Sequence, residues 1–271
     1  MRQSLHNTGY NIRFCSVIAS HDLMEADVKI KLLIAYDGSG FSGWQMQAGA
    51  RTVQDTLKGA LTTLLGEPVA IFGAGRTDSG VHASGQVAHF DLLAPRVPPE
   101  RIKLALPGLL TPEILVMESS EAEEDFHACF SAKARVYRYR FTCGPLFPWL
   151  RNFCVKFPEP FDKSRMEAAL APLVGRRDFT SFSLRDCEAK TRVRDIRRIT
   201  VEETAGGFDL IFEADGFLRK MIRLIIGTLL RAYVQKGPAE HIAAVLEARD
   251  NKHAAAPAPP GGLYLERVDY F

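Results

Sequence analysis

The strongest constraint on the fold is that strand-like and helix-like segments occur in two similar sets, without a strict alternation of strand and helix. In the first set, residues 28–36 (VKIKLLIAY) alternate like a strand, and residues 52–66 (TVQDTLKGALTTLLG) carry apolar residues at helical spacing. Thr52 is placed to cap that helix and Gly66 to end it. Further strands are expected at 68–75, 86–93, 114–119, 134–142, 195–204 and 207–214, and further helices at 99–106, 163–173, 218–235 and 239–248.

This order favours an α+β fold made of two halves, each a sheet with helices packed against it. The predicted division is an N-terminal α/β subdomain at 28–125 and a C-terminal α/β subdomain at 126–271. Residues 1–27 are expected to be an unstructured leader or the product of a mis-assigned start, with an organelle-targeting role left open. The Ala/Pro-rich stretch Ala254–Pro260 is expected to be a flexible, exposed loop.

The overall charge says little about a partner, because the formal net charge is only +2 and the pI about 8.3. A nucleic-acid-binding domain is usually far more basic, so any such site requires locally clustered charge. Two clusters could supply phosphate contacts: one on a predicted strand (Lys133, Arg135, Arg138, Arg140) and one further along the chain (Lys190, Arg192, Arg194, Arg197, Arg198). The five scattered cysteines predict no disulfide framework and favour the reducing cytoplasm.

Residues 73–90 (GAGRTDSGVHASGQVAHF) are the segment that points to chemistry. Its glycines let a backbone bend sharply, and Arg76 and Asp78 are the only charged side chains between Gly73 and His82. A carboxylate on such a loop can act as a nucleophile or general base, while a nearby guanidinium favours its ionised form. From spacing alone, an aspartate that merely caps a tight turn is an equally good interpretation.

Other chemistries fit this loop poorly. A phosphate-binding loop requires a Lys-Ser or Lys-Thr pair after the glycines, and none follows. A serine hydrolase built on Ser79 and His82 lacks the GxSxG pattern of a nucleophile elbow. His82 and His89 lie seven residues apart without a third ligand, which disfavours a metal site.

The segment RTDSGVHASGQVAHF resembles the signature of the bacterial TruA family of tRNA pseudouridine synthases, with Ser79 where alanine is commoner. Further matches follow in the family's order: YDGSGFSGWQMQ (36–47), FHACFSAKARVYRYRF (126–141), DFTSFS (178–183), GFLRKMIRLIIGTLL (216–230) and GGLYLERVDYF (261–271). The resemblance therefore covers residues 28–271. One departure is Pro107, which stands where family members commonly carry asparagine.

The resemblance implies two RRM/ferredoxin-like halves joined into one extended, mainly antiparallel sheet, with helices on one side and a central basic cleft. It implies an isomerase that converts uridine to pseudouridine at positions 38–40 of the tRNA anticodon stem-loop, without a metal or nucleotide cofactor, and that works as a cytoplasmic homodimer. Asp78 would be the catalytic carboxylate, by covalent attack or through a glycal-type intermediate. Tyr137 would stack on the target base, Arg223 would pair with Asp78, and Arg76 would fill the gap left by the flipped uridine.

Three alternatives remain open beside this one. A non-catalytic RNA-binding protein with two RRM-like halves would lack a use for Asp78, and the RNP1 stacking motif is absent. A related eukaryotic-type synthase would share the chemistry and modify other positions. An unrelated hydrolase would use Asp78 or Ser79.

Overall fold

The computed structural model describes residues 27–93, 97–158, 160–187, 189–235 and 237–271, so residues 1–26 of the predicted leader lie outside the description. The strands are β1 (Val28–Tyr36), β2 (Phe72–Gly73), β3 (His82–Leu92), β4 (Ile114–Ala122), β5 (Ala134–Thr142), β6 (Val155–Lys156), β7 (Gly175–Asp178), β8 (Val193–Thr204), β9 (Gly207–Ala214) and β10 (Leu263–Asp269). The helices are α1 (Val53–Leu65), α2 (Pro99–Ala105), α3 (Lys163–Leu170), α4 (Met221–Gln235) and α5 (Pro238–Ala248).

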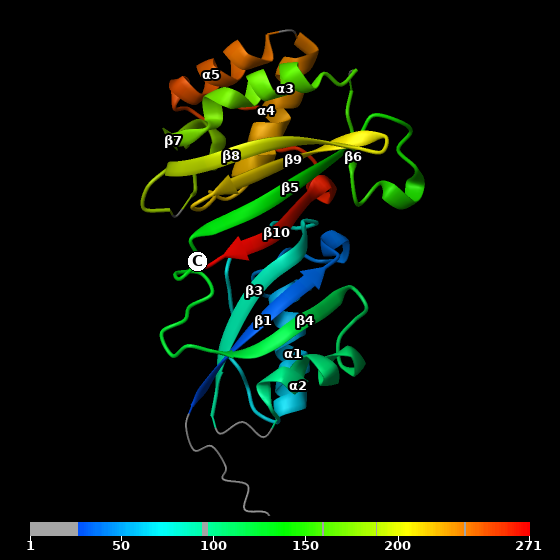
Figure 1. Cartoon of the computed structure of the whole chain (residues 1–271), viewed down its shortest axis with the longest axis vertical. Coiled ribbons are helices and arrows are strands. Elements are labelled where there is room, and N and C mark those ends of the chain that lie inside the picture. The colour runs from blue at the N-terminus through cyan, green and yellow to red at the C-terminus, as the bar shows by residue number, and fades with distance from the viewer. Residues whose placement is uncertain (1–26, 94–96, 159, 188, 236) are drawn as a thin grey trace, which may run out of the picture.

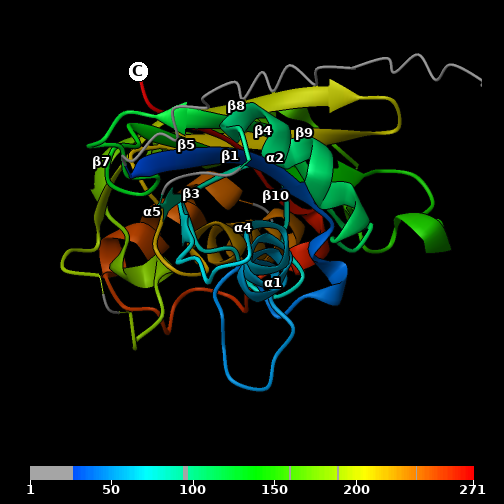
Figure 2. The same ribbon diagram turned by 90° about the horizontal axis from the view of Figure 1, so that it is seen from below.

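A single ten-stranded sheet runs along the molecule in the order β4-β1-β3-β10-β5-β9-β8-β7, with β2 added to β3 and β6 to β5 (Figure 1). The pairings are antiparallel except β10 with β3 and β5 with β6. Figure 2 shows α1, α4 and α5 on one face of this sheet. The predicted α+β class, with one extended and mainly antiparallel sheet, is thus confirmed.

Local sequence patterns explain why strand β1 and helix α1 form where they do. Along β1, fully buried Ile30, Leu32 and Ile34 alternate with half-buried residues, so one face of the strand meets the core. In α1, the Thr52 hydroxyl accepts a hydrogen bond from the Asp55 amide at 3.3 Å, and Gly66 ends the helix with a φ of +78°. Both predicted caps are confirmed.

The last strand of the chain, β10, lies in the middle of the sheet. It pairs in parallel with β3 and antiparallel with β5, with Leu265 opposite both Ala83 and Tyr137. The C-terminal segment therefore joins the two sets of elements that the sequence predicts. The division into subdomains at residue 125 remains a prediction.

One local prediction was wrong, and a second was correct only in part. Residues 68–71 do not form a strand, and only Phe72–Gly73 of that segment pair with β3. The stretch Ala254–Pro260 is irregular but not a free loop, because its backbone lies along α4. The Ala258 amide donates to the Arg223 carbonyl at 2.8 Å, and a side chain at Gly227 would collide with the Ala256 carbonyl oxygen. Small residues permit this close approach.

Within the described ranges, none of the helices combines the length and the apolar character that a membrane span requires.

Candidate active site

The glycine-rich loop between β2 and β3, residues 74–81, is held by backbone contacts on several sides. Its Thr77 carbonyl accepts from the Trp44 amide at 3.1 Å, and its Gly80 amide donates to the Phe41 carbonyl at 3.2 Å. Gly43 approaches the loop so closely that a side chain there would meet the Thr77 carbonyl, and its φ of +92° favours glycine. Residues 36–44 (YDGSGFSGW) therefore pack against the glycine-rich loop that carries Asp78 and hold it in place.

Side chains hold the same loop from the sheet below. The Tyr36 hydroxyl and the Thr77 hydroxyl lie 2.8 Å apart, and Gln86 donates to the Gly75 carbonyl at 2.8 Å. Arg135 donates to the Ala74 carbonyl at 3.1 Å. Among the described residues, the Gln86 side-chain oxygen is buried without a hydrogen-bond partner. These contacts fix the position of the carboxylate that the loop carries.

Asp78 and Arg223 form an ion pair. The Arg223 Nη1 donates to the Asp78 carboxylate at 3.0 Å, and its Nε donates to the Ala258 carbonyl at 2.8 Å. The Asp78 and Arg223 side chains are 19% and 13% exposed, so the pair is shielded but still accessible from solvent. The contact that the resemblance implied is therefore present. Arg223 lies in the first turn of α4, which brings two residues 145 positions apart together.

Tyr137 on β5 lies on the same side of the sheet as this pair. Its ring meets Phe217 edge to face at a centroid distance of 5.2 Å, and its hydroxyl points towards Gly75. Burial raises the pKa of the Tyr137 hydroxyl above its usual range, and the nearby Tyr36 and Asp78 add to the effect. The hydroxyl thus stays protonated at neutral pH and can donate a hydrogen bond.

Arg76 is exposed on the same loop, two residues before Asp78. No carboxylate of the described residues lies within salt-bridge distance of its guanidinium. The structure therefore brings Asp78, Arg223 and Tyr137 together and leaves Arg76 at the rim, in contact with solvent. The functional roles of all four remain predictions.

A serine hydrolase at this loop is not supported by the geometry. The Ser79 hydroxyl donates to the Phe41 carbonyl at 3.3 Å. Both nitrogens of buried His82 are engaged elsewhere: Nδ1 accepts from the Gly38 amide at 3.1 Å, and Nε2 lies 2.7 Å from the Asn152 carbonyl. His82 therefore fastens neighbouring loops together and is not placed to activate Ser79.

Two members of the β5 cluster, Arg138 and Arg140, are already paired with carboxylates, and the phosphate-binding role of the cluster remains a prediction. Arg138 contacts Asp209 at 2.6 Å and Glu266 at 2.7 Å, and Arg140 contacts Asp209 at 3.2 Å. Side chains alternate across a strand, so these two arginines lie on the face opposite Tyr137. Burial of Asp209 requires cationic partners, which makes Arg138 and Arg140 part of a structural ion-pair network.

Several supporting residues were not predicted, among them Tyr36, Gln86 and Phe217. Tyr36 and Gln86 stand inside the matching motifs, but a motif does not reveal which side chains reach the loop. Phe217 lies in the GFLRKM segment, where an aromatic residue six positions before Arg223 gives no local sign of contact with Tyr137.

The sequence of the chain matches a known protein family. A family model described as tRNA pseudouridine synthase matches residues 32–131 and 169–271, a span that includes the loop, most of the sheet and α4. This match places the chain among RNA-modifying isomerases.

Curated relatives narrow the assignment. The chain is 41% identical to tRNA pseudouridine synthase A of Geobacillus sp. (strain WCH70), over 89% of this chain and 98% of the relative. It is 40% identical to the protein of that name from Myxococcus xanthus, over 89% and 92%, and 38% identical to that from Limosilactobacillus reuteri (strain DSM 20016), over 89% and 96%. The chain belongs to the TruA family of tRNA pseudouridine synthases, as its motifs predict.

Proposed function

We propose that the protein isomerises uridine to pseudouridine in the anticodon stem-loop of tRNA, at positions 38–40, with Asp78 as the catalytic carboxylate. The observation that carries this proposal is the Asp78–Arg223 ion pair at 3.0 Å, on a firmly held loop beside the Tyr137 ring. A carboxylate that is shielded, paired and still reachable suits attack on a sugar or base better than it suits the capping of a turn.

The reaction conserves every atom. The bond between N1 of uracil and C1′ of ribose breaks, the base rotates, and a bond from C5 to C1′ forms while C5 loses a proton and the freed nitrogen gains one. Asp78 can attack covalently, or it can remove the C2′ proton of the ribose to form a glycal-type intermediate and return a proton to C2′ when the bond from C5 to C1′ forms. Arg223 would keep Asp78 anionic and oriented in either case. The scheme requires no metal, nucleotide or redox cofactor.

The target base must leave the helical stack to reach Asp78. Tyr137 offers a ring for stacking and a protonated hydroxyl, which suits the binding of an unstacked base. Arg76, exposed at the rim of the loop, is placed to enter the space that the flipped base vacates.

The direct test uses unmodified tRNA transcripts incubated with purified protein in excess EDTA, followed by carbodiimide treatment and reverse transcription to map pseudouridine. We expect signal on the 3′ side of the anticodon stem-loop from the wild-type protein and none from Asp78→Ala, which should still fold and bind tRNA. Signal at other positions would keep the chemistry and transfer the assignment to the eukaryotic-type specificity. Retained activity in folded Asp78→Ala would remove Asp78 from its role.

We further propose that the protein works as a homodimer in the cytoplasm. The loop around residues 146–150 carries large exposed apolar side chains, namely Leu146, Phe147, Trp149 and Leu150, with the Phe147 and Trp149 rings stacked at 4.9 Å. Apolar surface of this kind commonly marks a protein interface. Sedimentation equilibrium tests the assembly, and a Trp149→Glu variant should shift it to the monomer.

A further inference from the structure

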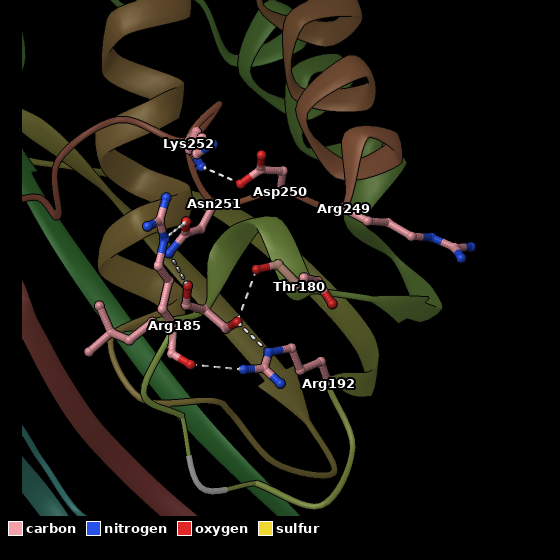
Figure 3. Close-up of a pocket in the computed structure, with 9 residues that line it drawn as sticks. Thr180, Arg185, Arg192, Arg249, Asp250, Asn251 and Lys252 are labelled. Carbon is pink, nitrogen blue, oxygen red and sulfur yellow. Dashed lines mark hydrogen bonds between the residues drawn. The ribbon is translucent and has the colours of Figure 1, made fainter.

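A polar cavity of about 450 Å³ lies in the C-terminal half, apart from Asp78 (Figure 3). It opens between the end of α5, the turn Thr180–Phe182 and the start of β8. Of the described residues that line it, only Leu184 is apolar, and none is aromatic. The cavity therefore offers neither the apolar walls of a typical small-molecule site nor a ring on which a base could stack.

The lining of this cavity is rich in cations, because Arg185, Arg192, Arg249 and Lys252 all contribute to it (Figure 3). The Arg192 Nε donates to the Ser183 hydroxyl at 2.9 Å, and the Arg185 Nε donates to the Asn251 side-chain oxygen at 3.2 Å. These bonds hold each guanidinium by its inner nitrogen. The Arg192 Nη2 also donates to the Arg185 carbonyl at 3.4 Å. Among the described residues, the Arg192 Nη1 and both outer nitrogens of Arg185 have no hydrogen-bond partner and can meet a ligand.

Few anions compensate this charge from within the protein. In the part of the chain that the structure describes, no carboxylate lies within 4 Å of the charged nitrogens of Arg185, Arg192 or Lys252. One carboxylate, that of Asp250, lines the cavity, and it accepts the Lys252 backbone amide at 3.1 Å. The fourth cation of the rim, Arg249, extends away from the others in Figure 3 and approaches Asp178 at 3.8 Å.

The cavity is connected to the candidate active site through α4. The Asp250 amide donates to the Ser181 hydroxyl at its wall, and the same segment then follows α4 until the Ala258 amide reaches the Arg223 carbonyl. On the other wall, Asp186 next to Arg185 contacts Arg219 at 3.5 Å, four residues before Arg223. The segment that lines the cavity therefore also reaches the candidate active site.

We propose that the cavity binds a backbone phosphate of the tRNA whose target uridine lies at Asp78. The proposal rests on the proposed function and adds to it a contact outside the reacting centre. Guanidinium groups present a planar fork that matches phosphate oxygens, and lysine adds a mobile point charge. Such contacts position a nucleic acid without reading its sequence, which suits a cavity without stacking groups.

The test measures tRNA binding by fluorescence anisotropy at several KCl concentrations, for wild type, Lys252→Gln, and the double variant Arg185→Gln/Lys252→Gln. We expect about tenfold weaker binding of the double variant at about 0.1 M KCl, and a slope of log Kd against log [KCl] that is lower by about one for each cation removed. Arg249→Gln, a cation of the same rim that points away, is the matched control and should bind like wild type.

Each outcome has one meaning. Unchanged affinity and salt slope in the double variant, with a wild-type melting temperature, would overturn the proposal. A second outcome would show that the cavity binds only a free anion. In that case inorganic phosphate would stabilise the wild type but not the double variant, while the salt dependence of tRNA binding would be the same in both proteins. This outcome too would overturn the proposal. The binding measurement does not depend on turnover. If the protein formed no pseudouridine but the double variant still showed a reduced salt dependence of tRNA binding, the proposed function would be refuted and the phosphate site would be supported.

Discussion

Removal of the Arg223 side chain tests the site most directly, because the guanidinium connects the reacting loop to the C-terminal segment. In Arg223→Ala, Asp78 loses a partner at 3.0 Å and the Ala258 carbonyl loses a donor at 2.8 Å. Breaking a fully buried ion pair costs about 3–5 kcal/mol, since the remaining charge stays unpaired. The two side chains here are 13% and 19% exposed, so water offsets part of that loss. We therefore expect a destabilisation of about 2–3 kcal/mol.

For a chain of this size the expected destabilisation corresponds to a fall of about 5–10 °C in melting temperature. The assay is thermal unfolding followed by circular dichroism, together with pseudouridine formation at saturating tRNA. Arg223→Lys, which keeps a charge but cannot make both contacts in the same geometry, should fall between the wild type and Arg223→Ala. Loss of turnover should accompany the loss of stability.

Arg219→Ala is the control for this experiment. Arg219 precedes Arg223 by four residues and meets Asp186 at 3.5 Å, but both of these side chains are largely exposed. Exposed pairs contribute about 0–1 kcal/mol, so the control should melt close to the wild type. If Arg223→Ala melted like Arg219→Ala, the Asp78–Arg223 pair would not stabilise the fold, and its assigned structural role would be refuted.

Three further predictions concern other parts of the molecule. Gly227→Ala should lower the unfolding free energy by about 1–3 kcal/mol, because the added methyl group meets the Ala256 carbonyl. Gly59→Ala, at a position in α1 that is open to solvent, should instead raise the unfolding free energy by up to about 1 kcal/mol. Denaturant unfolding of the two variants measures both changes. Burial, with His127 nearby, lowers the pKa of His89 to about 4, so the unfolded chain takes up a proton below about pH 6.5 while the folded chain does not. Stability should therefore fall as the pH falls from about 6.5 to about 4, and His89→Gln should flatten this dependence in melts at about pH 7 and about pH 5. Since burial raises the pKa of Tyr137 and its protonated hydroxyl is the proposed donor, ionisation of Tyr137 should cause no fall in wild-type turnover up to about pH 9.5. A falling limb below that pH that Tyr137→Phe abolishes would contradict this.

The parts of the fold that were predicted from sequence are those with local causes. Strand β1 and helix α1 match their predicted bounds, because period-two alternation and the caps at Thr52 and Gly66 act over a few residues. The central place of β10 was not predicted, since its partners β3 and β5 lie more than a hundred residues earlier in the chain. Strands β6 and β7, of two and four residues, are too short to carry a pattern.

The candidate site, too, could be predicted from local sequence only in part. The loop around Asp78 stands out by composition, but its contact with Arg223 was expected only through the family resemblance, because 145 residues separate the two. The separation of Arg138 from the candidate site has a local cause as well. Alternation along β5 already separates Arg138 from Tyr137, so a single strand could not present both to the same ligand.

The C-terminal segment, residues 250–265, connects the elements that form the candidate site. From Asp250 it leaves the wall of the basic cavity, follows α4, and exchanges hydrogen bonds with Arg223 at Ala258. Pro260 then packs against Gly80 beside the reacting loop, and Leu265 enters the sheet opposite Tyr137. An Ala/Pro-rich composition suits this route, because bulky side chains would push the backbone away from α4, and prolines reduce the entropy that is lost when an irregular segment is ordered. The segment that the sequence predicts as a flexible loop, Ala254–Pro260, therefore helps to place Arg223 of α4 against Asp78 of the distant glycine-rich loop.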